Sequence, residues 1–117
     1  MRHVVAQPDV PEGKPLTEPV LMILMSLADQ PRHGYALLKD IEGLSGGRVR
    51  LSTGTLFGAL RRLLEDGSIE RFDQEDTSRQ KQAYRLTAGG RAQLQQELDR
   101  MRQLTRAGIA RLKASEA

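Results

Sequence analysis

Residues 52–67, STGTLFGALRRLLEDG, constrain what this chain can fold into more than any other segment. On a helix that turns about 100° per residue, one stripe holds four leucines: Leu56, Leu60, Leu63 and Leu64. The opposite side holds small residues and two arginines: Gly54, Thr55, Gly58, Arg61 and Arg62. Ser52 or Thr53 can cap such a helix, and Gly67 can end it. The segment predicts a helix that is anchored through leucine and carries little bulk on its outer side.

The glycine in the middle of this helix needs an explanation, because an exposed glycine there costs about 1 kcal/mol relative to alanine. A helix that enters the major groove of DNA needs a polar outer face and room for a close approach. Groups suited to base edges and phosphates are present: Ser52, Thr53, Thr55, Arg61 and Arg62. The alternative is an ordinary amphipathic helix with a solvated face, and the segment alone does not decide between the two.

Helices are also predicted on both sides of this segment. Apolar residues at helical spacing predict one at 17–29, capped by Thr17, and one at 35–44. The second carries Lys39, Asp40 and Glu42 on its outer side. A final helix at 88–113 spans about 40 Å. Its apolar positions step by three and four as a heptad-like seam: Leu94, Leu98, Met101, Thr105, Gly108 and Leu112.

Strands are expected between the helices. A mini-strand at 48–51 alternates arginine with apolar residues, and strands at 68–73 and 81–86 flank a polar loop. Because Ile69 and Phe72 do not share a strand face, we expect a twist or a bulge there. The fold class is therefore mainly α with a small β-hairpin. The order predicts a flexible arm at 1–16, a winged helix-turn-helix at 17–86 and, at 87–117, a helix that pairs with a second copy.

Composition excludes several classes of function. The chain has no cysteine, so disulfides and thiolate metal sites are excluded, and His3 and His33 lack a second histidine at ligand spacing. No nucleophile–base pair stands out, so we expect neither an enzyme nor a cofactor. No apolar run suits a membrane helix or a signal peptide, so we expect a cytoplasmic protein without a membrane partner. The net charge of +3 mildly favours a polyanionic partner.

Other candidate DNA contacts lie outside the central helix. Arg79 and Lys81, in the loop 76–82, can follow a phosphate backbone or enter the minor groove, or the loop can be merely solvated. Tyr35 and Lys39 open the helix that would cross the backbone, although core packing explains Tyr35 equally well. Arg50 would flank the same surface. The arm at 1–16 is either a solvated leader or a further DNA contact.

The chain resembles the PadR family of bacterial transcriptional regulators over residues 16–91. The resemblance rests on HGY at 33–35, GTL at 54–56, the run from Leu60 to Ile69 and YRLT at 84–87 followed by Gly90. The chain departs from the family in lacking a proline after Ser52 and in having Phe57-Gly58 where Tyr-Pro is usual.

The resemblance implies a winged-helix homodimer that binds double-stranded DNA at a palindromic operator and represses transcription. The segment from Ser52 to Arg62 would be the recognition helix, Arg79 and Lys81 would belong to the wing, and residues 94–112 would form the dimer seam. Some members release DNA on binding a small aromatic or hydrophobic effector, which makes such a compound a candidate partner. Two alternatives stay open: a winged helix that binds protein, and a sensor whose main event is ligand binding.

Overall fold

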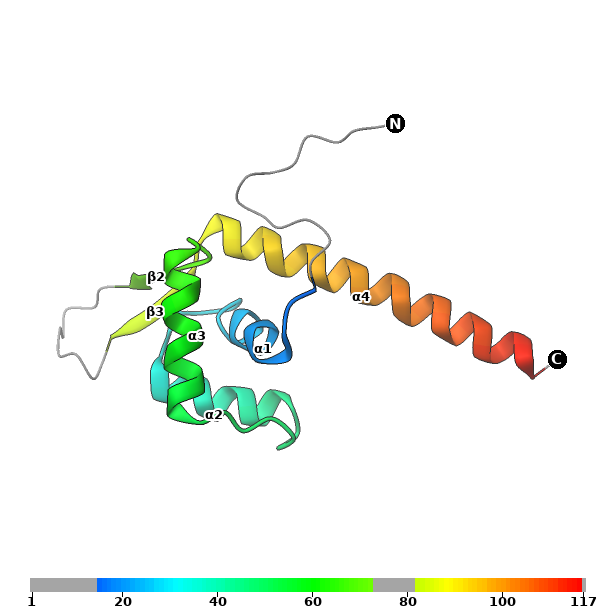
Figure 1. Cartoon of the computed structure of the whole chain (residues 1–117), viewed down its shortest axis with the longest axis horizontal. Coiled ribbons are helices and arrows are strands. Elements are labelled where there is room, and N and C mark those ends of the chain that lie inside the picture. The colour runs from blue at the N-terminus through cyan, green and yellow to red at the C-terminus, as the bar shows by residue number, and fades with distance from the viewer. Residues whose placement is uncertain (1–14, 73–81, 117) are drawn as a thin grey trace.

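The computed structural model describes residues 15–72 and 82–116 (Figure 1). Its described helices are α1 (Glu18–Ser26), α2 (Gly34–Leu44), α3 (Thr53–Glu65) and α4 (Ala88–Ser115). Its described strands are β1 (Arg32–His33), β2 (Ile69–Phe72) and β3 (Ala83–Leu86). Helices α1, α2 and α3 lie together beside the sheet, and α4 crosses this group and extends well beyond it (Figure 1). Three helices followed by a β-hairpin are the winged helix-turn-helix that the sequence predicts.

Side-chain caps determine where three of the helices begin. The hydroxyls of Thr17, Ser52 and Thr87 accept hydrogen bonds from backbone N–H groups in the first turns of α1, α3 and α4. Each cap satisfies one of the N–H groups that a helix start leaves without a partner. Helix α1 ends at Ser26, three residues earlier than expected, and the Arg32 side chain binds the Ser26 carbonyl there at 2.8 Å.

One apolar core lies between the three helices and the sheet. Its fully buried members come from the three helices, the residue that follows α1, and β2: Ile23, Leu24, Leu27, Leu37, Ile41, Leu56, Leu60 and Ile69. Tyr84 and Leu86 of β3 are also buried and close the core on the sheet side. Leucine and isoleucine therefore do most of the packing, which compensates for an aromatic content of only 3%.

The sheet has three antiparallel strands in the order β1-β3-β2. Strands β2 and β3 pair in regular register from Ile69↔Leu86 to Phe72↔Ala83, so of the two expected alternatives the bulge is wrong. Phe72 lies at the end of that ladder, where the Arg85 guanidinium covers its ring at 4.9 Å from the centroid. A charged group over the ring face shields Phe72 without any change of register.

The mini-strand expected at 48–51 is also wrong. Val49 and Leu51 do pack partly against the core, as their alternation predicts. However, the Val49 N–H bonds to the Ser45 hydroxyl at 2.9 Å instead of joining a strand ladder. The third strand is β1, which pairs Arg32 with Tyr84. Strand β1 is extended only because it pairs with β3. Its two residues carry no apolar alternation, so the sequence alone does not predict a strand there.

The beginning of α4 is locked to the turn between α3 and β2. The Thr87 N–H donates to the Ser68 carbonyl at 3.1 Å, and the Ser68 hydroxyl donates to the Gln93 side-chain oxygen at 2.9 Å. Gly90 lies so close to the Ser68 carbonyl that any Cβ there would overlap it. From Met101 to Glu116, by contrast, every residue of the chain is exposed. Within the described residues, no helix combines the length and the apolar character needed to cross a membrane.

Candidate nucleic-acid interface

Helix α3 separates its leucine side from its polar side as the sequence predicts. The buried side consists of Leu56, Ala59, Leu60 and Leu63. The exposed side carries the predicted DNA contacts: Ser52, Thr53, Gly54, Thr55, Arg61 and Arg62. Ser52 also caps the helix, and its hydroxyl donates to the Thr55 hydroxyl at 3.0 Å. The first turn contains no acidic side chain, so the partial positive charge of the helix start faces outward uncompensated.

Gly58 lies half-buried in the middle of α3, and the described residues give no internal reason for a glycine there. A Cβ at Gly58 would meet nothing within 4 Å, and its φ is not among the positive values that favour glycine. Gly54, one turn earlier, would likewise meet only the Ser52 hydroxyl oxygen, at 4.0 Å. Both glycines therefore leave the backbone on the outer face of α3 uncovered by side chains, and neither is required by packing within the described chain.

An aromatic contact joins the start of α2 to α3. The Phe57 ring lies against Gly34, where a Cβ would come within 2.6 Å of the ring. Tyr35 meets the same ring edge to face, with centroids 6.4 Å apart, and keeps 64% of its own surface exposed. Core packing for Tyr35 is therefore wrong, and its ring lies outside beside α3. Phe57 was not identified from the sequence as the contact between α2 and α3. The signal was the glycine at position 34 before Tyr35, which lets the Phe57 ring come close to the start of α2.

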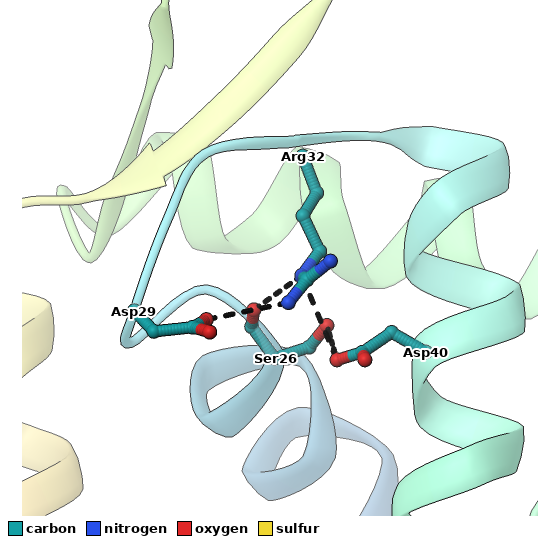
Figure 2. A network of polar contacts seen from close by, with 4 residues as sticks. All are labelled: Ser26, Asp29, Arg32 and Asp40. Carbon is teal, nitrogen blue, oxygen red and sulfur yellow. Dashed lines mark hydrogen bonds and ion pairs between the residues drawn. The ribbon is translucent and has the colours of Figure 1, made fainter.

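A polar network holds α2 against α1 (Figure 2). The Ser26 hydroxyl donates to Asp40 at 2.6 Å, and Arg32 donates to the Ser26 carbonyl at 2.8 Å and to Asp29 at 3.3 Å. Asp40 was expected on the outer side of α2 but turns toward this network, because Ser26 is buried and its hydroxyl needs an acceptor. The network fixes the helix that carries Tyr35 and Lys39, and both of these residues remain exposed.

The remaining predicted contacts divide into described and undescribed residues. Arg50 is exposed near the start of α3, and its side chain pairs with Glu42 at 3.2 Å. Such an exposed pair is weak, so Arg50 stays available to a phosphate. Arg79 and Lys81 lie outside the described residues, and their role stays a prediction.

A groove runs between the start of α1, α3 and the first turns of α4. Its volume is about 340 Å³, and its apolar lining includes Leu16, Val20, Ala59 and Leu63. Arg62 also lines it, so Arg62 and Arg61 lie on different flanks of α3. Thr17, Asp66 and Gln93 also line the groove, so its lining is part apolar and part polar, and binding of a small ligand there stays a prediction.

The expected dimer seam needs one correction. Leu94 is only 6% exposed because it belongs to the core of its own chain, and Leu98 packs partly against that core. Met101, Thr105, Gly108 and Leu112 are exposed, as an unpaired surface requires. Leu104 and Ile109 are exposed beside them and were missed, because they fall outside the strict heptad positions.

No group of three or more histidine, cysteine, aspartate or glutamate side chains in the described part of the chain is arranged to hold a metal ion. The exposed polar side chains among the predicted contacts lie on α3 and at the start of α2. Their exposed groups are hydroxyls, guanidinium groups, an ammonium group and a phenol, which suit hydrogen bonding and charge pairing with an anionic polymer.

Two relatives align with most of this chain. The transcriptional regulator Rv3488 of Mycobacterium tuberculosis (strain ATCC 25618 / H37Rv) is 35% identical over 86 residues, 74% of this chain and 78% of that protein. An uncharacterized 37.1 kDa protein in transposon TN4556 of Streptomyces fradiae is 36% identical over 85 residues, 73% of this chain. The chain spans only 23% of the length of that transposon protein.

Solved structures share the fold. A PadR family transcription regulator from hypervirulent Clostridium difficile R20291 superimposes with a TM-score of 0.69 at 20% identity, covering 82% of this chain and 99% of its own. Bacillus subtilis PadR in complex with operator DNA superimposes with a TM-score of 0.59 at 22% identity, covering 68% and 45%. The family model for the transcriptional regulator PadR-like family matches residues 23–96. With that match over more than half of its length, and with Rv3488 as a relative, the chain belongs to the PadR-like family of transcriptional regulators.

Proposed function

We propose that this chain binds double-stranded DNA through the outer face of α3 and regulates transcription as a repressor. The observation that carries the proposal is the surface of α3 itself. Hydroxyls and arginines are exposed around Gly58, whose missing side chain serves no contact within the described residues. A helix with that surface fits the major groove closely. The fold shared with Bacillus subtilis PadR, whose structure holds operator DNA, supports the proposal.

In this proposal the contacts divide between base edges and phosphates. Thr53, Thr55 and Arg61 face base edges, and Gly54 and Gly58 let the backbone approach them. Phosphate contacts come from the flanks: Tyr35, Lys39, Arg50, Ser52, Arg62, Arg79 and Lys81. Arginines outnumber lysines among them, which suits bidentate contacts to phosphate or guanine. Phosphate contacts supply most of the affinity, and α3 supplies the sequence preference.

The proposed DNA-binding unit is a homodimer on a palindromic operator. The exposed seam of α4, Met101, Thr105, Gly108 and Leu112, pairs with a second copy and covers apolar surface that one chain leaves open. A two-fold axis then places the two α3 helices about 34 Å apart, one turn of DNA.

A salt titration tests DNA binding against the alternative of a protein-binding module. Fragments recovered from a random DNA pool by the purified protein are titrated with it at several salt concentrations. A protein that neutralises about six phosphates loses roughly a thousandfold in affinity between about 50 and 200 mM salt. Arg61→Ala should weaken selected fragments by about 1–3 kcal/mol if Arg61 contacts a base. Arg111→Ala, on the far half of α4, is the control and should change nothing. A chain that enriches no fragment is not a DNA-binding regulator.

The groove between α1, α3 and α4 supports release by a small aromatic or hydrophobic effector. A ligand there would touch Ala59 and Leu63 of α3 and Gln93 of α4 at once, so it could favour one placement of the recognition helix. Val20→Trp would fill the groove from the half-buried side of α1 and leave the sequence of α3 unchanged. An effector found by screening should release DNA from the parent chain, whereas this variant should not respond to it.

A further inference from the structure

Glu97 is the only charged side chain that is buried among the described residues, with 6% of its surface exposed. One carboxylate oxygen accepts from the Leu16 backbone N–H at 3.3 Å. The Arg100 guanidinium donates to both carboxylate oxygens, at 2.9 and 2.7 Å. A buried charge is costly unless it is paired in this way, so its presence here indicates a positional role beyond packing.

The place of Glu97 on α4 makes that position important. Gly90 and Gln93 fix the first turns of α4 to Ser68, and nothing after Met101 touches the rest of the described chain closely enough to bury it. The Glu97–Leu16 hydrogen bond is the last one along α4 that reaches a described residue outside this helix. Helix α4 extends well beyond the other helices and the sheet (Figure 1).

The helix acts as a lever between these points. Measured along the helix axis from Gly90, Glu97 lies seven residues or about 10 Å away, and Leu112 lies about 33 Å away. A shift of about 1 Å at Glu97 therefore grows to about 3 Å at Leu112. Base pairs stack at about 3.4 Å, so a movement of this size compares with one base pair of operator length.

We propose that Glu97 is a positioning residue that fixes the direction of α4 against the winged helix, and thereby the separation of the two recognition helices in the dimer. The Leu16 backbone is the fixed point, and Arg100 holds the carboxylate toward it. The inference rests on the homodimer of the proposed function. It adds that the tolerated spacing between operator half-sites is determined at Glu97, far from the DNA.

Spin labels on α3 test this inference without DNA. The chain has no cysteine, so Glu65→Cys, at the exposed end of α3 and outside the proposed contacts, labels each subunit once. Distances between the two labels are measured by pulsed electron resonance in that parent, in E97M and in E97Q. Methionine keeps the volume and helix propensity of this site but accepts no hydrogen bond from Leu16, and such replacements of buried charges usually fold.

The parent should give a narrow distribution, and E97M should broaden it by about 3 Å, the displacement of the lever. E97Q retains an oxygen that accepts from the Leu16 N–H and should stay narrow. Arg102→Ala removes an exposed pair with Asp99 on the same helix and should also stay narrow. An E97M distribution as narrow as that of the parent would overturn the inference. A parent that gives no distance between labels would overturn the homodimer, and the inference with it.

Operator spacing gives a second readout on fragments that the parent binds. Adding one base pair between the half-sites should weaken the parent by about tenfold, 1.4 kcal/mol, because both recognition helices can no longer engage together. E97M should bind the fragments of the two spacings with affinities within about twofold of each other, because its α4 can adopt the direction that either spacing requires. If E97M shows the same spacing penalty as the parent, the inference about Glu97 is contradicted, whereas the proposed DNA binding is not.

Discussion

Gly58 shows how a single residue connects the fold to the proposed function. On a helical wheel it falls opposite the leucine side of α3, so its position was predictable from the sequence. Its purpose was not, because a glycine inside a helix can also serve a close contact within the protein. The structure removes that explanation for the described residues, since a Cβ there would meet nothing within 4 Å.

Gly58→Ala should therefore change stability and DNA affinity in opposite directions. The free energy of unfolding should rise by about 0.5–1 kcal/mol, because alanine is the better helix former. Affinity for selected DNA should fall by about 1–3 kcal/mol, because the added methyl group crowds a packed interface. Gly43→Ala in α2 is the matched control: it also meets no atom, and it should stabilise the fold without affecting DNA. Thermal melts and binding titrations on both variants check this, and unchanged affinity in Gly58→Ala would argue against a close backbone approach.

Gly90 is the opposite case, a glycine that the chain itself requires. A Cβ at Gly90 would overlap the Ser68 carbonyl, and a backbone atom cannot move aside as a side chain can. Gly90→Ala should lower the free energy of unfolding by about 3 kcal/mol, measured by urea titration. Its neighbour Gly89 meets only ordinary contacts, at 3.7 and 3.8 Å, so Gly89→Ala should be neutral or stabilising. Equal effects in the two variants would contradict the close packing of α4 on Ser68. The sequence shows two adjacent glycines, and only the packing distinguishes them.

At the scale of elements, the sequence predicts what depends on local pattern and fails where a partner decides. The leucine spacing and the cap residues place α2, α3 and α4 to within two residues of their observed bounds. Strand β1 was missed because pairing with β3 alone makes it a strand. Asp40 and Glu97 were missed for a related reason. A charged residue on a helix is ordinarily solvated, and only Ser26 and Leu16, distant in sequence, turn these two inward.

The network at Asp40 should contribute measurably to stability. Asp40→Ala leaves the buried Ser26 hydroxyl without its acceptor and should cost about 1–3 kcal/mol in the free energy of unfolding. Glu42→Ala on the same helix removes only the exposed pair with Arg50 and should cost less than about 1 kcal/mol. Chemical denaturation of both variants makes the comparison, and an Asp40→Ala loss no larger than that of Glu42→Ala would contradict the network's role.

Glu97 should make the attachment of α4 depend on pH. Hydrogen bonds from Arg100 hold the pKa of the Glu97 carboxyl below its ordinary value of 4.5, although burial acts in the opposite direction. A lowered folded-state pKa contributes stability that is present above the unfolded pKa and is lost as pH falls through the folded one. The difference in melting midpoint between the parent and Glu97→Gln should therefore be constant near neutral pH and shrink below about pH 4.5. A difference independent of pH would contradict the ion pair.

At the scale of the whole molecule, the far half of α4 is the part whose apolar residues a single chain leaves exposed. Leu112→Arg should convert the dimer to monomers in sedimentation equilibrium, because it places a charge at the most exposed apolar residue of α4. Arg106 lies on another side of α4, so the Arg106→Ala variant should remain a dimer. The monomeric variant should also lose affinity for a two-half-site fragment while keeping a similar affinity for a single half-site. A Leu112→Arg dimer would move the interface elsewhere.

Methylation protection tests the central proposal, that α3 occupies the major groove, most directly. Dimethyl sulfate modifies guanine N7, which lies in the major groove, and adenine N3, which lies in the minor groove. The bound homodimer should protect guanine N7 in two blocks whose centres lie about 10 base pairs apart. Full reactivity at every guanine N7 of a fragment that the protein binds would contradict the placement of α3 in the groove.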